Sequence, residues 1–208
     1  MNSSIRFIII FLPFVIALSG CSDYSRIYDD IKRLKVQPID MDVSLMMNLS
    51  KNYDPDEKSE MTFVEYFDST ECTPCAISRL YLWDLYINKH TEYNDLVKYV
   101  FIFSAFDTID IANYNVNNQL ITVYWDSCGT FIKNNPHIPQ NTKMHSFLLD
   151  RNNTITLIGN PLLNNKIEKL LNKMVRKRLK KKQYHECKKE DHSEPLCYYN
   201  ESISKKYK

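Results

Sequence analysis

The stretch that most constrains the fold is Met61–Leu82, with the sequence MTFVEYFDSTECTPCAISRLYL. Its first part, Thr62–Phe67, is β-branched and aromatic apart from Glu65, which is typical of a central strand covered on both faces. A short polar loop leads to Cys72–Cys75, and apolar residues then recur at helical spacing. Because the first turn of a helix needs no amide partner, Pro74 indicates that a helix begins here. The sequence therefore predicts a buried strand joined through a cysteine pair to an amphipathic helix.

The two cysteines lie where this helix begins, and Ser69 and Thr70 just before them are candidate caps. A thiol at a helix N-terminus faces the positive end of the helix dipole and several free amides, which favours its thiolate. We expect Cys72 to be this exposed thiol, and Cys75, one turn further in, to form a disulfide with it and so allow a redox cycle. The alternatives are a structural bridge or half of a zinc site, but no second ligand pair follows in this region.

The N-terminus predicts a targeting segment over residues 1–20. Arg6 precedes an apolar run, Phe7–Leu18, that is too short to span a bilayer as a stable helix. The run ends in Leu-Ser-Gly-Cys, which resembles the lipobox of bacterial lipoproteins and would make Cys21 a lipidated first residue carrying acyl chains such as palmitate. The resemblance implies the envelope of a Gram-negative bacterium, anchoring to the inner or outer membrane, and a domain facing the periplasm. An ordinary secretory signal is the alternative.

Export to an oxidising compartment would permit the cysteines to form disulfides, and lipidation would remove Cys21 from those that can pair. Six cysteines less Cys21 leave five. The simplest partition pairs the two in the C-x-x-C motif and joins Cys187 to Cys197, which leaves Cys128 free, and we expect Cys128 to be a small buried side chain. His185 and the nearby His192 make zinc binding the alternative at the second pair, although the spacing matches no zinc finger. We therefore expect no metal site.

The rest of the chain divides by composition into a tether with an N-terminal strand or hairpin (21–58), one folded domain (59–175) and a basic tail with a possible disulfide loop (176–208). The early strand is expected near Val36–Val43. The later elements are expected to be the cysteine helix to about Lys89, strands at Leu96–Phe106, Leu120–Trp125, Ser146–Leu149 and Thr154–Ile158, and a closing helix at Leu162–Val175.

Charge is informative only through its distribution. The net charge is +2, but the residues from Met174 onward carry 11 Lys and Arg against 5 Asp and Glu, so the basic excess belongs to the tail. Such a run can bind anionic lipid headgroups, or it can be a solvated helix end. We expect no nucleic-acid partner for an exported lipoprotein.

The order strand, C-x-x-C at a helix start, strand, hairpin and final helix resembles the thioredoxin fold, an α/β, three-layer α/β/α sandwich with a mixed central sheet. More narrowly, Phe147–Pro161, FLLDRNNTITLIGNP, is similar to the hairpin of TlpA-type, or redoxin-like, periplasmic disulfide reductases, which are often membrane-anchored. The resemblance covers about Met61–Val175, and the cysteine motif and the hairpin are its specific parts.

The resemblance implies a thiol-disulfide oxidoreductase in which Cys72 attacks and Cys75 resolves. It places Glu65 where the family keeps a buried acid that takes the proton from the resolving thiol, and desolvation would raise the pKa of that carboxyl. The alternative is that Glu65 lies at a sheet edge in water. Thr73 and Pro74 would contact substrate. The implied partners are exported protein thiols or disulfides and an electron-donor thiol protein, and no organic cofactor is expected.

Two departures from the family pattern open other functions. Glu71 stands where the family has an aromatic residue, and its carboxylate would disfavour a neighbouring thiolate. The cis-proline that the family places before the hairpin falls near Met144, while Pro139 is too early. Met144 and His145 would therefore contact substrate. Alternatively, they could face the cysteines and bind Cu(I), as proposed by similarity to Sco-type copper-delivery proteins. Those proteins separate their cysteines by three residues rather than the two found here, which counts against this alternative. His145 on the solvent side of a strand and a non-catalytic scaffold with a static bridge are the remaining alternatives.

Overall fold

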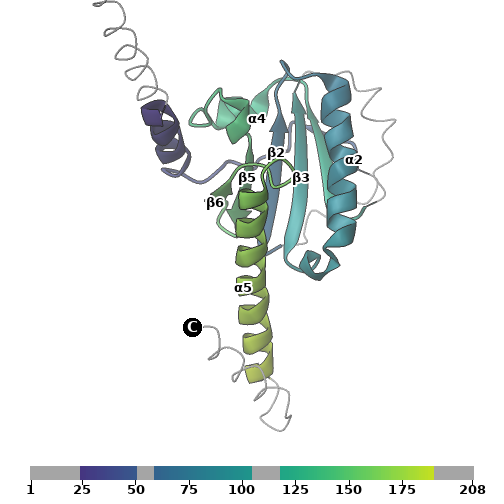
Figure 1. Ribbon diagram of the computed structural model, residues 1–208. Coiled ribbons are helices and arrows are strands. Elements are labelled where there is room, and N and C mark those ends of the chain that lie inside the picture. The colour runs from purple at the N-terminus through teal and green to yellow at the C-terminus, as the bar shows by residue number, and fades with distance from the viewer. Residues whose placement is uncertain (1–23, 51–58, 105–117, 190–208) are drawn as a thin grey trace, which may run out of the picture.

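The computed structural model describes residues 24–50, 59–104 and 118–189, which form one mixed sheet with helices around it (Figure 1). The six strands are β1 (Met47–Asn48), β2 (Met61–Phe67), β3 (Val97–Ser104), β4 (Ile121–Asp126), β5 (Ser146–Asp150) and β6 (Ile155–Ile158). The helices are α2 (Thr73–Lys89), α4 (Thr130–Asn134), α5 (Asn165–Lys189), the 3-10 turns η1 (Thr91–Tyr93) and η2 (Thr142–Met144), and a helix at 24–34.

Strand β2 lies at the centre of the sheet, whose order is β1-β4-β3-β2-β5-β6. It pairs parallel with β3 and antiparallel with β5. Its alternate residues pack into two separate cores, Phe63 and Phe67 on one face and Val64 and Tyr66 on the other. Burial on both faces is the reason that this segment is an almost continuous apolar run.

The two faces of the sheet are covered differently. Helices α2 and α5 both pack on one face, where Trp83 and Leu171 share a core with Phe63. The opposite face is covered by α4, the segment 34–46 and the residues that precede β5, and Phe131 is a buried member of that core. The predicted three layers are therefore present, but one short helix and irregular chain build the second outer layer.

The connections confirm the predicted α/β class and its thioredoxin-like order. Strand β2, helix α2 and parallel strand β3 form the first unit, and the β5–β6 hairpin followed by α5 forms the second. Helix α5 begins later than predicted and continues to Lys189, because the basic run after Val175 consists of good helix formers without glycine or proline. Figure 1 shows it projecting beyond the sheet. In the described ranges, no helix has the length and apolar character needed to cross a bilayer.

The predicted strand at Val36–Val43 is wrong. Residues 24–34 are helical, and the N-terminal strand is β1, which pairs antiparallel with β4. Asp40 and Asp42 each accept a hydrogen bond from the amide two residues further on, and Pro38 lacks an amide hydrogen altogether. These local bonds compete with a strand ladder, so the segment forms turns that cover the sheet.

Asn135 holds this N-terminal segment on the domain. Its fully buried side chain accepts from the amide of Asp40 at 2.7 Å and donates to the carbonyls of Asp40 and Phe131, each at 2.9 Å. The amide oxygen and the amide nitrogen of Asn135 therefore bond to the backbone of Asp40, which is 95 residues away, and the nitrogen also bonds to Phe131 in α4.

Replacing Asn135 with alanine should therefore remove the side-chain partner of the backbone N–H and C=O of Asp40. We expect Asn135→Ala to lower the free energy of unfolding by about 1–3 kcal/mol, measured by urea denaturation. Asn152→Ala is the control, because that side chain is exposed in the β5–β6 turn. Equal effects of the two substitutions would contradict the anchoring role.

Candidate functional site

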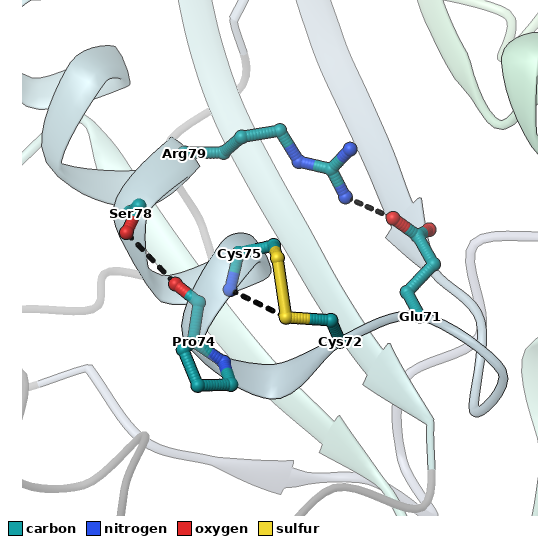
Figure 2. The surroundings of a disulfide bond; sticks show 6 residues. All are labelled: Glu71, Cys72, Pro74, Cys75, Ser78 and Arg79. Atoms are coloured by element: carbon teal, nitrogen blue, oxygen red, sulfur yellow. Dashed lines mark hydrogen bonds and ion pairs between the residues drawn. A yellow bond between two sulfur atoms is a disulfide. The ribbon is translucent and has the colours of Figure 1, made fainter.

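The site begins at the N-terminus of α2, where Cys72 is the N-cap residue. Its backbone is extended, and its Sγ accepts a hydrogen bond from the amide of Cys75 at 3.3 Å (Figure 2). Pro74 lies in the first turn, as predicted. The predicted caps Ser69 and Thr70 are wrong, because they lie in the turn before the helix, where the Thr70 amide is bonded to Asp68. The sulfur itself satisfies an amide at the positive end of the helix dipole.

The two cysteines form a disulfide with their Cα atoms 5.3 Å apart. Both are exposed, as expected for Cys72, and the position of Cys75 one turn further in does not bury it. Their difference is electrostatic, because the cap position and the Cys75 amide favour negative charge on the Cys72 sulfur. The arrangement leaves the bond open to an incoming thiol.

The other cysteines lie apart from this pair. Cys128 is free, as expected, but it is exposed rather than buried, because it lies in the turn that precedes α4. Cys187 belongs to the helical backbone of α5, and its side chain lies outside the described residues. Cys197 and Cys21 also lie outside them. The Cys187–Cys197 disulfide and the lipidation of Cys21 therefore remain predictions.

Glu65 lies on the face of β2 that packs against α2, and it is buried with 3% exposure. Trp83 Nε1 donates to its Oε2 at 2.6 Å, and Asn160 Nδ2 donates to its Oε1 at 2.9 Å. Arg79 Nε lies 3.5 Å from Oε1. The sheet-edge alternative is therefore wrong, since this carboxyl occupies the centre of the sheet.

Burial raises the pKa of Glu65 from 4.5 to about 7. Desolvation is the main cause, and Glu71 adds to it, while the positive charge of Arg79 and the hydrogen bonds from Trp83 and Asn160 act in the opposite direction. A carboxyl with this pKa exchanges its proton close to neutral pH, which is the property of an efficient general base or acid there.

Arg79 connects this buried carboxyl to the cysteine turn. Figure 2 shows its side chain extending from α2 toward Glu71, with which it forms an ion pair. Its guanidinium carbon also lies 4.7 Å from the centre of the Phe67 ring, within the range of a cation–π contact. The Glu71 carboxylate, expected to disfavour a neighbouring thiolate, is therefore paired with a cation.

A cavity of about 590 Å³ adjoins these charged groups. Its lining combines Glu65, Glu71 and Arg79 with groups from η2 and from the chain after β6, among them Lys143, Met144 and Asn160. Sequence reasoning missed Arg79, Trp83 and Asn160. The first two could have been found, because they follow Cys75 by four and eight residues and so share a helix face with it.

Met144 and His145 occupy the place expected for the family's cis-proline, where the chain forms the turn η2 instead. His145 is buried, its Nε2 is 2.8 Å from the carbonyl oxygen of Pro139, and its ring packs edge-on against Tyr66. The alternative that His145 lies on the solvent side of a strand is therefore wrong. Over the described ranges, no three His, Cys, Asp or Glu residues are placed to hold a metal, and no contact favours the copper-binding alternative.

Comparison with known proteins adds little to these observations. No family model and no curated protein matches the chain. Among solved structures, BF1870 of unknown function from Bacteroides fragilis is 18% identical, covers 56% of this chain and 81% of its own, and gives a TM-score of 0.38. StoA from Bacillus subtilis is 24% identical over 50% of this chain and 77% of its own, with a TM-score of 0.36. Copper-bound yeast Sco1 is 10% identical over 66% of this chain and 90% of its own, with a TM-score of 0.40. At these levels the likenesses carry no argument, and the fold assignment rests on the strand order.

The raised pKa of Glu65 predicts a particular dependence of stability on pH. Because the pKa is about 7 in the folded chain and 4.5 in the unfolded one, the penalty for burial is absent below pH 4.5 and grows as pH rises to about 7. Glu65→Gln should therefore gain roughly 3 kcal/mol in unfolding free energy relative to the wild type across this window. Urea denaturation of the oxidised proteins at a series of pH values measures it. If the stability of Glu65→Gln and of the wild type changed with pH in parallel, the raised pKa of Glu65 would be contradicted. Glu92→Gln, which replaces an exposed acid, is the control.

Proposed function

We propose that the protein is a thiol-disulfide oxidoreductase that reduces disulfides of exported proteins. The observation that carries the proposal is an exposed Cys72–Cys75 disulfide at the N-terminus of α2, the helix whose Trp83 and Arg79 contact a buried carboxyl with a pKa of about 7. A purely structural bridge needs neither the exposure nor the titrating carboxyl. Thr73 and Pro74, which separate the two sulfurs in sequence, are the proposed contacts of the substrate chain.

The reaction starts from the dithiol form. The Cys72 thiolate attacks one sulfur of a substrate disulfide, forms a bond to it, and releases the other substrate sulfur as a thiolate. The Cys75 amide and the helix dipole stabilise the attacking thiolate. This step produces a mixed disulfide between Cys72 and the substrate.

The second step removes the substrate. Glu65 accepts the proton of the Cys75 thiol, directly or through one water, and the Cys75 thiolate attacks the Cys72 sulfur. The bond between Cys72 and the substrate breaks, and its electron pair leaves on the substrate sulfur. The substrate has then gained two electrons, and the chain holds the Cys72–Cys75 disulfide. A dithiol partner protein must return two electrons before the next cycle.

Met144 is the proposed substrate contact from the loop before β5, because it lines the same cavity as Glu65. His145, also expected to contact substrate, is buried and bonded within that loop, so we propose that it holds the loop in shape.

The location of the protein belongs to the same proposal. We propose that residues 1–20 are removed and that Cys21 carries acyl chains, which would hold the domain at an envelope membrane, facing the periplasm. An oxidising compartment is the place where a disulfide reductase finds substrates. Basic residues on the exposed end of α5 are compatible with a nearby anionic surface.

The reduction potential of the cysteine pair tests the redox assignment. We expect a value near the ~−270 mV of thioredoxin, measured by equilibration with dithiothreitol and thiol trapping on a Cys128→Ser background. A value near ~−120 mV would indicate an oxidant instead, and a pair that stays oxidised well below about −300 mV would be a structural bridge, which would end the enzyme proposal.

The order of attack is tested with single cysteine variants. Cys75→Ser should accumulate a mixed disulfide with a disulfide-containing protein, because the resolving thiol is missing, whereas Cys72→Ser should accumulate several-fold less. Non-reducing electrophoresis with mass spectrometry identifies the adducts. Equal trapping by both variants would contradict the assigned roles.

Lipidation is tested separately. Expressed in a Gram-negative host, the full-length chain should incorporate radiolabelled palmitate and sediment with membranes, and Cys21→Ala should lose the label. Cys128→Ala is the matched control and should retain it. A labelled Cys21→Ala protein would refute the anchor.

A further inference from the structure

Arg79 is shared between two carboxylates in different surroundings. Its side chain is 22% exposed, while that of Glu65 is 4% exposed and that of Glu71 is 19% exposed. One partner therefore lies in the core and the other at the rim of the cysteine turn. A single guanidinium thus connects the buried base to a carboxylate that solvent reaches more readily.

The contacts of Arg79 are unequal. It bonds directly to Glu71 through one terminal nitrogen, and its planar group lies over the Phe67 ring. Its Nε faces Glu65 at 3.5 Å but is buried and makes no hydrogen bond within the described part of the chain. The guanidinium is therefore held toward Glu71 and stops short of a full bond to Glu65.

We propose that the Glu71–Arg79 ion pair is a positioning device that holds Arg79 short of a hydrogen bond to Glu65, so that Glu65 can act as a base. The inference rests on the proposed role of Glu65 as the base for Cys75. Without Glu71, the guanidinium is free to close on Glu65 and complete the missing hydrogen bond. Glu65 would then stay ionised and become a weaker base.

The groups that face Glu65 come from three elements. Helix α2 contributes Arg79 and Trp83, the chain after β6 contributes Asn160, and the loop before α2 contributes Glu71. Of these four, only Arg79 and Glu71 carry charge. Lys143, from η2, lines the same cavity and is the further charged group to consider there. Arg79 and Glu71, the two members of the proposed device, are the charged groups that act on the pKa of Glu65.

The test measures the titration of Glu65 in the full-length oxidised chain, so it does not depend on any redox activity. Carboxyl carbons are followed by NMR, and Glu65→Gln assigns the signal. We expect Glu71→Gln to lower the titration midpoint by about one pH unit, because it removes a negative charge and releases Arg79. Arg79→Gln should raise the midpoint by about one pH unit. Arg79→Lys keeps a positive charge, so its midpoint should lie between those of Arg79→Gln and the wild type.

Glu92→Gln is the charge-matched control, because it removes the same charge near the opposite end of α2 and should leave the midpoint unchanged. An unchanged or raised midpoint in Glu71→Gln would overturn the proposal, as would a lowered midpoint in Arg79→Gln.

A second readout separates this inference from the proposed function. The rate at which Cys75 resolves a mixed disulfide is measured against pH in the same variants. If Glu65 is the base, the acid limb of this profile shifts to lower pH in Glu71→Gln and to higher pH in Arg79→Gln, in parallel with the NMR midpoint. NMR shifts with an unmoved limb would support control of Glu65 by Arg79 while refuting Glu65 as the base for Cys75.

Discussion

The burial of one carboxyl at the centre of the sheet is the constraint on which the site depends. A carboxylate without partners in an apolar core is costly, so Glu65 requires donors from the elements that enclose it. Trp83 on α2 and Asn160 after β6 supply them, and each comes from a different part of the chain. The packing of α2 and of the chain after the hairpin against β2 therefore determines the chemistry of this residue as well as its burial.

The same packing places the cysteines. Helix α2 follows β2 through a short loop and packs on one face of the sheet, and Cys72 acts as its N-terminal cap. Cys75, Arg79 and Trp83 follow one another at intervals of four residues and so lie along one face of the helix. Redox pair, cation and indole therefore follow one another along the helix that packs on the strand carrying Glu65.

Local sequence patterns predicted most of the fold. The apolar run of β2, the helical spacing after Pro74 and the turn residues of the β5–β6 hairpin are local signals, and the elements that they predict are present. The predictions failed where local bonding competes with an element. Aspartate side chains form turns at the expected strand near Val36, and the sulfur of Cys72 replaces the expected hydroxyl caps.

The sequence by itself determined the cysteine pair at a helix start, the central strand and the α/β order, because each depends on residues close together in the chain. Only the tertiary structure decided that Glu65 is buried beneath Trp83, that Asn160 donates to it, and that Arg79 lies between Glu65 and Glu71. Asn160 lies 95 residues from Glu65, and no local pattern encodes such a contact. Desolvation, which raises the pKa of Glu65, arises only when these distant segments pack together.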